Sequence, residues 1–155
     1  MTKLQAIIRY LCMNYPYKGE LSNARVTKMV YLADWLHAQQ RGEQLTDISW
    51  HFDHYGPFVT DVVEAAKMDR AMSVQYTTNM YGSPKVQLSY MGDPGESIDL
   101  TREERKVLDH VIEETAPLAF SSFINHVYDT YPIRTADRYS TLDLADLARQ
   151  EHRSR

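Results

Sequence analysis

The chain has 155 residues, an apolar fraction of 43% and a charged fraction of 25%, values typical of one soluble globular domain. Its formal net charge is −4, and because phosphate backbones repel an acidic chain, the composition disfavours nucleic acid as a partner. One cysteine excludes an internal disulfide, and the N-terminal region has no apolar run long enough for a signal peptide or a membrane span. These features predict a cytoplasmic protein with no membrane partner.

Two helices are predicted at the start of the chain. Apolar residues at helical spacing indicate a first helix, which Pro16 stops. The second begins near Ser22, a favoured N-cap residue, and runs to Arg41. Gly42 follows it, at the point where a helix C-terminus often needs a left-handed residue.

A strand and a third helix are predicted around the sequence Tyr-Gly-Pro at residues 55–57. Apolar and polar residues alternate over residues 48–52, which is typical of a short half-buried strand. Residues 58–68 have a helical pattern, and Pro57 fits the first turn of that helix. The sequence therefore predicts a rigid junction between a strand and a helix.

The second half of the chain adds a β-hairpin and three helices. Residues 72–91 alternate in period two around the turn at 81–84, and Thr101 with Glu104 forms a capping box ahead of a helix. A further helix is predicted near 118–130, with its end at Tyr131-Pro132, and a last one from Ser140 or Thr141. The predicted fold is an α+β single domain over residues 1–155, mostly helical, with a small antiparallel sheet formed by a β-hairpin and a short strand.

Catalytic chemistry has little support in the sequence. His51 and His54 are three residues apart, and on a strand that spacing directs their rings to opposite faces, with no defined third metal ligand. Neither a Gly-rich phosphate loop nor a nucleophile motif is present. We expect no enzymatic activity, no metal and no cofactor; a hydrolase with a site around His51, Asp53 and His54 is a rival interpretation.

A DNA-binding role is the main alternative function. A helical protein with a β-hairpin in its second half is similar to a winged helix, which would use the hairpin as a wing. The hairpin has one basic residue, Lys85, whereas a wing that contacts DNA usually needs more positive charge.

Three segments, in order, resemble the SocA-like Panacea antitoxin domain: V-T-K-M-V-Y-L-A-D-W-L-H, R-G-E-Q-L-T and W-H-F-D-H-Y-G-P-F-V. The positions that match the family pattern are Lys28, Met29, Val30, Tyr31, Ala33, Gly42, Leu45, Tyr55, Gly56 and Pro57. The resemblance covers about residues 3–115, and the chain departs from it after Pro117.

This resemblance implies an antitoxin that neutralises a cognate protein toxin by direct contact, in bacteria or their phages. Some relatives act as adaptors that deliver the toxin to a protease, so a protease is a further implied partner. The sequence is also compatible with a homo-oligomer.

The rings around the Tyr-Gly-Pro turn are the candidate contact residues. Pro57 restricts its own backbone and Gly56 permits unusual angles, so rings held by this turn would lose little entropy on binding. The expected partner-facing residues are Trp50, His54, Tyr55 and Phe58, with Phe52 in the core. A purely structural role for all these rings is the alternative. The expected structural residues of the motif are Lys28, Tyr31, Ala33, Gly42, Gly56 and Pro57.

Overall fold

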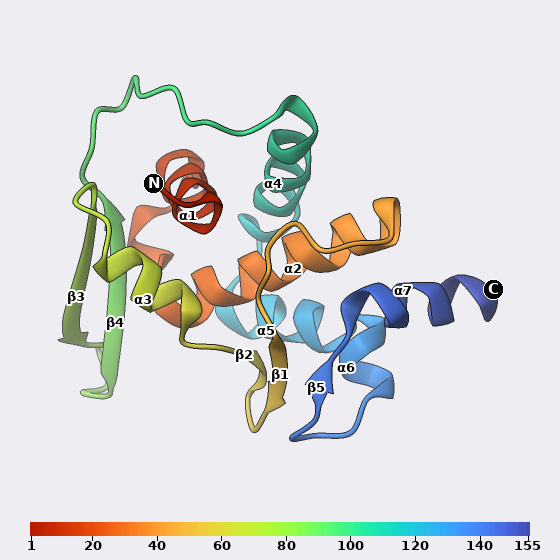
Figure 1. Ribbon diagram of the computed structural model, residues 1–155. Helices are drawn as coiled ribbons and strands as arrows, with labels where there is room; N and C mark the ends of the chain where they lie inside the picture. The colour runs from red at the N-terminus through yellow and green to blue at the C-terminus, as the bar shows by residue number, and fades with distance from the viewer.

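Helix α2, Asn23–Arg41, runs through the middle of the molecule in the computed structural model, which describes residues 1–155 (Figure 1). Ser22 caps the helix by accepting the backbone N–H of Arg25, and Gly42 ends it with a φ of +80°. These caps confirm the predicted bounds. All residues from 25 to 35 are buried, so other elements cover the helix on every side.

Helices from both ends of the chain provide this cover. Helices α1, Lys3–Asn14, and α4, Arg102–Thr115, pack against α2 and against each other, and α7, Leu144–Arg153, also packs on α2. Helix α4 starts with the predicted capping box, in which Thr101 and Glu104 exchange side-chain and backbone hydrogen bonds.

The other helical segments are short: η1 Lys18–Glu20, α3 Asp61–Lys67, α5 Phe120–Tyr128 and α6 Tyr131–Thr135. The prediction that Tyr131-Pro132 ends a helix is wrong. Helix α5 has already ended, and Pro132 lies in the first turn of α6, where its missing N–H costs no helical hydrogen bond.

The Tyr-Gly-Pro turn belongs to a β-hairpin and not to a strand-to-helix junction. Strands β1, Trp50–Asp53, and β2, Gly56–Phe58, are antiparallel, with Phe52 opposite Pro57. Gly56 reverses the chain with a φ of +99°, so Pro57 enters β2 instead of starting a helix. Because β2 is an edge strand, a proline there breaks no central ladder.

A third strand from the end of the chain completes this sheet. Strand β5, Thr141–Leu142, pairs with β1 on the side away from β2, which gives the order β2-β1-β5. The predicted start of the last helix, at Ser140 or Thr141, is wrong. That helix starts at Leu144, because Thr141 and Leu142 are paired with His51 and Trp50.

The predicted hairpin in residues 72–91 is confirmed as β3, Met72–Thr78, and β4, Pro84–Tyr90. It forms a separate two-stranded sheet at one side of the molecule (Figure 1). Strand β4 lies next to the body of the protein, where the Leu88 N–H donates to the Leu21 carbonyl at 2.8 Å.

The core is a single cluster of 36 buried hydrophobic residues, of which Trp50, Tyr15, Tyr31 and Phe123 are among the largest. The helices and small antiparallel sheets confirm the predicted α+β fold class, with two sheets in place of one. None of the helices has the length and apolar character needed to span a membrane.

Candidate partner-binding surface

Strand β1 is held to the central helix by a buried carboxylate. Asp34 on α2 accepts the indole N–H of Trp50 at 2.8 Å, the Thr46 backbone N–H at 2.8 Å and the Thr46 hydroxyl at 2.6 Å. Burial raises the pKa of Asp34, and the donated hydrogen bonds oppose that change. These bonds fix the loop between α2 and β1, and with it the position of the hairpin.

Trp50 therefore does not face a partner, contrary to the sequence-based expectation. Its side chain is fully buried, and its ring packs edge-on against Tyr31 with centroids 5.6 Å apart. The physical reason is strand periodicity: positions 50 and 52 share one face of β1, and that face packs on the core. Phe52 is buried there, as predicted.

The expected structural residues on α2 all lie in the interior. Tyr31 shares a 2.8 Å hydrogen bond between its hydroxyl and that of Thr130, and Ala33 is also buried. Lys28 is buried as well. Burial lowers the pKa of the Lys28 ammonium, and the nearby Asp53 carboxylate partly counters this.

Three of the four candidate contact residues reach the surface. His54 and Tyr55 form the turn between β1 and β2 and are exposed, Tyr55 to 73%, while Phe58 is half-buried on β2. The rings of His54 and Tyr55 meet edge to face, 4.7 Å apart. The hairpin thus presents a small group of rings at its tip.

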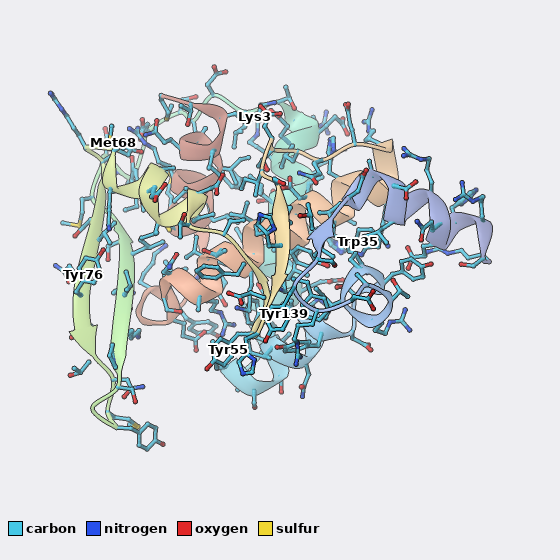
Figure 2. The ribbon with its side chains drawn as sticks, turned by 60° about the horizontal axis from the view of Figure 1, so that its bottom comes forward. Lys3, Trp35, Tyr55, Met68, Tyr76 and Tyr139 are labelled. Carbon is cyan, nitrogen blue, oxygen red and sulfur yellow. The ribbon has the colours of Figure 1, made fainter.

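Tyr139 joins this group from the far end of the sequence. Its hydroxyl lies 3.4 Å from Nδ1 of His54, and its side chain is 73% exposed. Figure 2 shows Tyr55 and Tyr139 beside each other, at the end of the molecule that carries the turn between β1 and β2. We call the set His51, His54, Tyr55, Phe58 and Tyr139 the ring patch.

Tyr139 occupies its place through backbone pairing with β1. Its N–H donates to the carbonyl of Phe52, whose own N–H donates to the Ser140 carbonyl at 2.8 Å. Tyr139 is the one non-glycine residue with a positive φ, at 67°. Strained backbone of this kind persists only where the surroundings enforce it, and it is often found at functional sites. Sequence reasoning missed Tyr139, because no local pattern marks a residue that gains its position from a distant strand.

The ring patch borders a surface hollow of about 540 Å³, lined by residues that include His51, Phe58 and Tyr139. Nδ1 of His51 lies 3.3 Å from the Thr141 hydroxyl, so His51 and His54 face different neighbours. No group of three or more His, Cys, Asp or Glu side chains in the chain is arranged to hold a metal ion. The arrangement suits contact with a partner through rings and hydrogen bonds.

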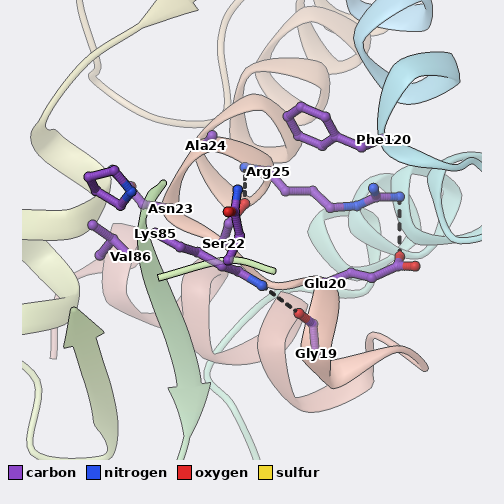
Figure 3. Close-up of a pocket in the computed structure, with 11 residues that line it drawn as sticks. Gly19, Glu20, Ser22, Asn23, Ala24, Arg25, Lys85, Val86 and Phe120 are labelled. Carbon is purple, nitrogen blue, oxygen red and sulfur yellow. Dashed lines mark hydrogen bonds and ion pairs between the residues drawn. The ribbon is translucent and has the colours of Figure 1, made fainter. Parts of the chain in front are cut away.

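A second hollow, of about 520 Å³, lies between the start of α2 and strand β4 (Figure 3). Its hydrophobic wall residues are Ala24, Val86 and Phe120. Arg25 also lines it, but its guanidinium is committed inside the protein: Nε donates to the Tyr15 hydroxyl at 2.9 Å, and Nη2 donates to two backbone carbonyls. Sequence reasoning did not single out this hollow.

A comparison with protein families identifies the chain. The family described as antitoxin SocA-like, Panacea domain, matches residues 26–132. The chain belongs to this SocA-like antitoxin family. No curated protein and no solved structure matched the chain.

The Panacea match includes Tyr55, Gly56 and Pro57 of the β1–β2 hairpin but ends before Tyr139. It starts later and extends further than the resemblance in the sequence motifs, which covers about residues 3–115. The ring patch therefore combines a hairpin from within the family match with one residue from the segment that follows it.

Proposed function

We propose that this Panacea-domain chain neutralises a cognate protein toxin by direct contact, with the ring patch as the contact surface and without enzymatic activity. Membership of the SocA-like antitoxin family carries the proposal of a toxin partner. The ring patch supports the choice of surface, because tyrosine and other aromatic residues are enriched among the residues that dominate binding energy at interfaces.

The structure beneath the ring patch favours tight binding. Trp50 anchors β1 to Asp34, and Gly56 packs against the ring of Tyr128, where an added methyl group would lie 3.6 Å from the ring. Rings on a fixed hairpin lose little conformational entropy when a partner binds. The hydroxyls of Tyr55 and Tyr139 also offer hydrogen bonds at the edge of an apolar contact.

Alanine variants of the two exposed tyrosines test the contact surface. The chain is co-expressed with the toxin encoded beside it, and growth rescue and the dissociation constant are measured for Tyr55→Ala and Tyr139→Ala. Loss of a central aromatic anchor costs about 2 kcal/mol or more, which is roughly thirtyfold in affinity. Tyr17→Ala is the control, because Tyr17 is also exposed but lies outside the ring patch.

Unchanged melting temperatures are required for all three variants, so that weaker binding is not a folding effect. Wild-type affinity in both Tyr55→Ala and Tyr139→Ala would reject the ring patch as the contact surface. Failure of the wild-type chain to rescue growth or to co-elute with the toxin would reject the antitoxin function itself.

The adaptor role implied by the family resemblance is a more specific form of this proposal. An adaptor would shorten the lifetime of the toxin in cells, whereas a simple inhibitor would leave it unchanged or extended. A pulse-chase measurement of toxin half-life, with and without this chain, separates the two. We place the activity in the cytoplasm, in keeping with a single cysteine, Cys12, whose thiol is buried and whose pKa burial raises to about 12.

The winged-helix alternative has weaker support. It needs free positive charge on the β3–β4 hairpin, where Lys85 is the only basic residue. The Lys85 ammonium donates to the Gly19 carbonyl at 3.1 Å, which holds it against the protein (Figure 3). Specific binding of the chain to DNA upstream of its own gene, in a gel-shift assay, would favour this alternative.

A further inference from the structure

Strand β3 has a free edge over residues 74–78, since the Met72 N–H already donates to the Asp69 carbonyl at 3.1 Å. The sheet has only two strands, so β4 pairs with one edge of β3, and α3 packs against β3 as well. In Figure 1, β3 is the outermost element on its side of the molecule, and no other segment lies beyond it. Figure 2 shows Tyr76 of β3 at this same outer margin.

The register identifies the backbone groups that this edge presents. The Met91 N–H donates to the Ala71 carbonyl, and the Asn79 N–H donates to the Ser83 carbonyl, so Ala71 and Asn79 direct their polar groups toward β4. Hydrogen-bonding direction alternates along a strand. Val74, Tyr76 and Thr78 therefore direct their N–H and C=O groups away from β4, to the free edge.

Nothing in the sequence of β3 protects this edge from pairing. The strand M-S-V-Q-Y-T-T contains no charged residue and no proline, and from Gln75 onward its side chains are exposed. Natural proteins usually guard an open edge with charge, proline, a bulge or a covering segment. The unguarded edge over residues 74–78 is therefore open to pairing with another strand.

The side chains of β3 complement a second copy of the same strand. In an antiparallel register centred on Gln75, Val74 of one copy lies opposite Tyr76 of the other on one face, and Ser73 lies opposite Thr77 on the other face. Pairs of aromatic with β-branched residues and pairs of hydroxyl residues both stabilise antiparallel strands. The twofold symmetry forms each pair twice. Strand β3 itself contributes no charge to these pairs, and Lys67 of α3 adds a cation 5.2 Å from the Tyr76 ring on one face.

The same register brings exposed hydrophobic residues together at the two ends of the strand. Met80 and Tyr81, at the hairpin tip, are 87% and 85% exposed, and Met68, just before β3, is 81% exposed. Asn79 holds the tip by accepting the N–H groups of Tyr81 and Ser83. An antiparallel arrangement places the tip of one copy beside the start of β3 in the other, which covers these side chains.

We propose that the chain forms a homodimer through antiparallel pairing of β3 with β3 of a second copy, which joins the two hairpins into one four-stranded sheet. Val74 and Tyr76 of each copy exchange backbone hydrogen bonds across the twofold axis, and Gln75 faces its own counterpart. The contact is a narrow strand edge, so the dissociation constant is on the order of micromolar. The dimer leaves the ring patch of each copy free, because that patch lies on the other sheet.

Charge substitution at Gln75 tests the dimer and its register together. Sedimentation equilibrium of the purified chain, from about 1 µM to about 1 mM, brackets the expected affinity. Gln75→Lys and Gln75→Glu each place like charges opposite each other and weaken the dimer about fivefold. A mixture of the two variants restores association, because the heterodimer then pairs opposite charges. The Gln75 side chain is exposed, so neither variant affects the folded monomer.

Ser89→Lys is the matched control. Ser89 is paired with Ser73 in the hairpin but lies on β4, one strand away from the dimer seam, so this lysine leaves the dimer intact. A chain that stays monomeric over the whole concentration range overturns the proposal, as does a dimer that is insensitive to both Gln75 variants. A monomer whose toxin binding is weakened by Gln75→Lys also overturns it, because the toxin is then the occupant of the edge.

Discussion

The indole N–H of Trp50 donates to the carboxylate of Asp34 at 2.8 Å, and both side chains are buried. This bond joins the middle strand of the three-stranded sheet to the central helix α2. The exposed face of the same sheet carries His51 and Phe58 of the ring patch, so a buried interaction sets the position of the proposed contact surface.

Asp34→Ala should destabilise the protein by about 3 kcal/mol, because it leaves the buried donors of Trp50 and Thr46 without an acceptor. Urea denaturation at neutral pH measures the change. Asp47→Ala is the control, since Asp47 is exposed and its loss should change the free energy of unfolding by less than about 0.5 kcal/mol. Equal stability of the two variants would contradict a structural role for Asp34.

Trp50→Ala and Tyr55→Ala should differ sharply. Trp50 fills the core, so its truncation should cost about 3–5 kcal/mol of stability. Tyr55 is exposed, so its truncation should leave the melting temperature close to that of wild type while weakening toxin binding. A thermal melt and a binding titration on each variant provide the comparison. A wild-type melting temperature for Trp50→Ala would contradict the position of this ring in the core.

Gly56→Ala should destabilise the protein by about 1–2 kcal/mol, because an alanine resists a positive φ. The φ of Gly56 is +99°, whereas the position of an added methyl, 3.6 Å from the Tyr128 ring, is an ordinary contact. Backbone strain, and not a steric clash, is therefore the expected cause. Gly19→Ala is the matched control, because Gly19 has open space around it and no positive φ. Thermal melts of the two variants should separate clearly, and a shift for Gly19→Ala as large as that for Gly56→Ala would count against this explanation.

The ion pair between Arg9 and Asp69 should make stability depend on acid pH. The guanidinium of Arg9 donates two hydrogen bonds to Asp69, at 2.7 and 2.6 Å, and these bonds lower the pKa of Asp69 below its ordinary value of 3.8. The stabilisation is therefore complete above that ordinary value and is lost as pH falls through the lowered pKa.

Asp69→Asn should lower the free energy of unfolding at pH 7 by about 2 kcal/mol, since it removes a charged acceptor. Its stability should then decline less steeply than that of wild type below the ordinary pKa of 3.8. Denaturation curves at a series of pH values measure both effects. Glu113→Gln, at an exposed carboxylate, serves as the control. Parallel acid profiles for wild type and Asp69→Asn would contradict a lowered pKa.

Local signals in the sequence determined several elements correctly. Ser22 and Gly42 marked the ends of α2, Thr101 with Glu104 marked the start of α4, and alternation in residues 72–91 indicated the β3–β4 hairpin. Each signal depends on residues a few positions apart, because caps and turns are closed by neighbouring backbone groups. The ordered motifs around α2 and the Tyr-Gly-Pro turn likewise identified the family, which the match to residues 26–132 shows.

Tertiary structure alone decided the candidate site. The pairing of Gly56 with Asp53 turned the predicted strand-to-helix junction into a hairpin, and the face of β1 that packs on α2 buried Trp50. Tyr139 reached His54 because the segment before β5 pairs with β1, across a separation of 85 residues. Local patterns determine which residues suit a strand or a helix, but burial and the assembly of a surface depend on contacts between distant segments. Those contacts form only when the whole core packs, and the sequence near each residue does not encode them.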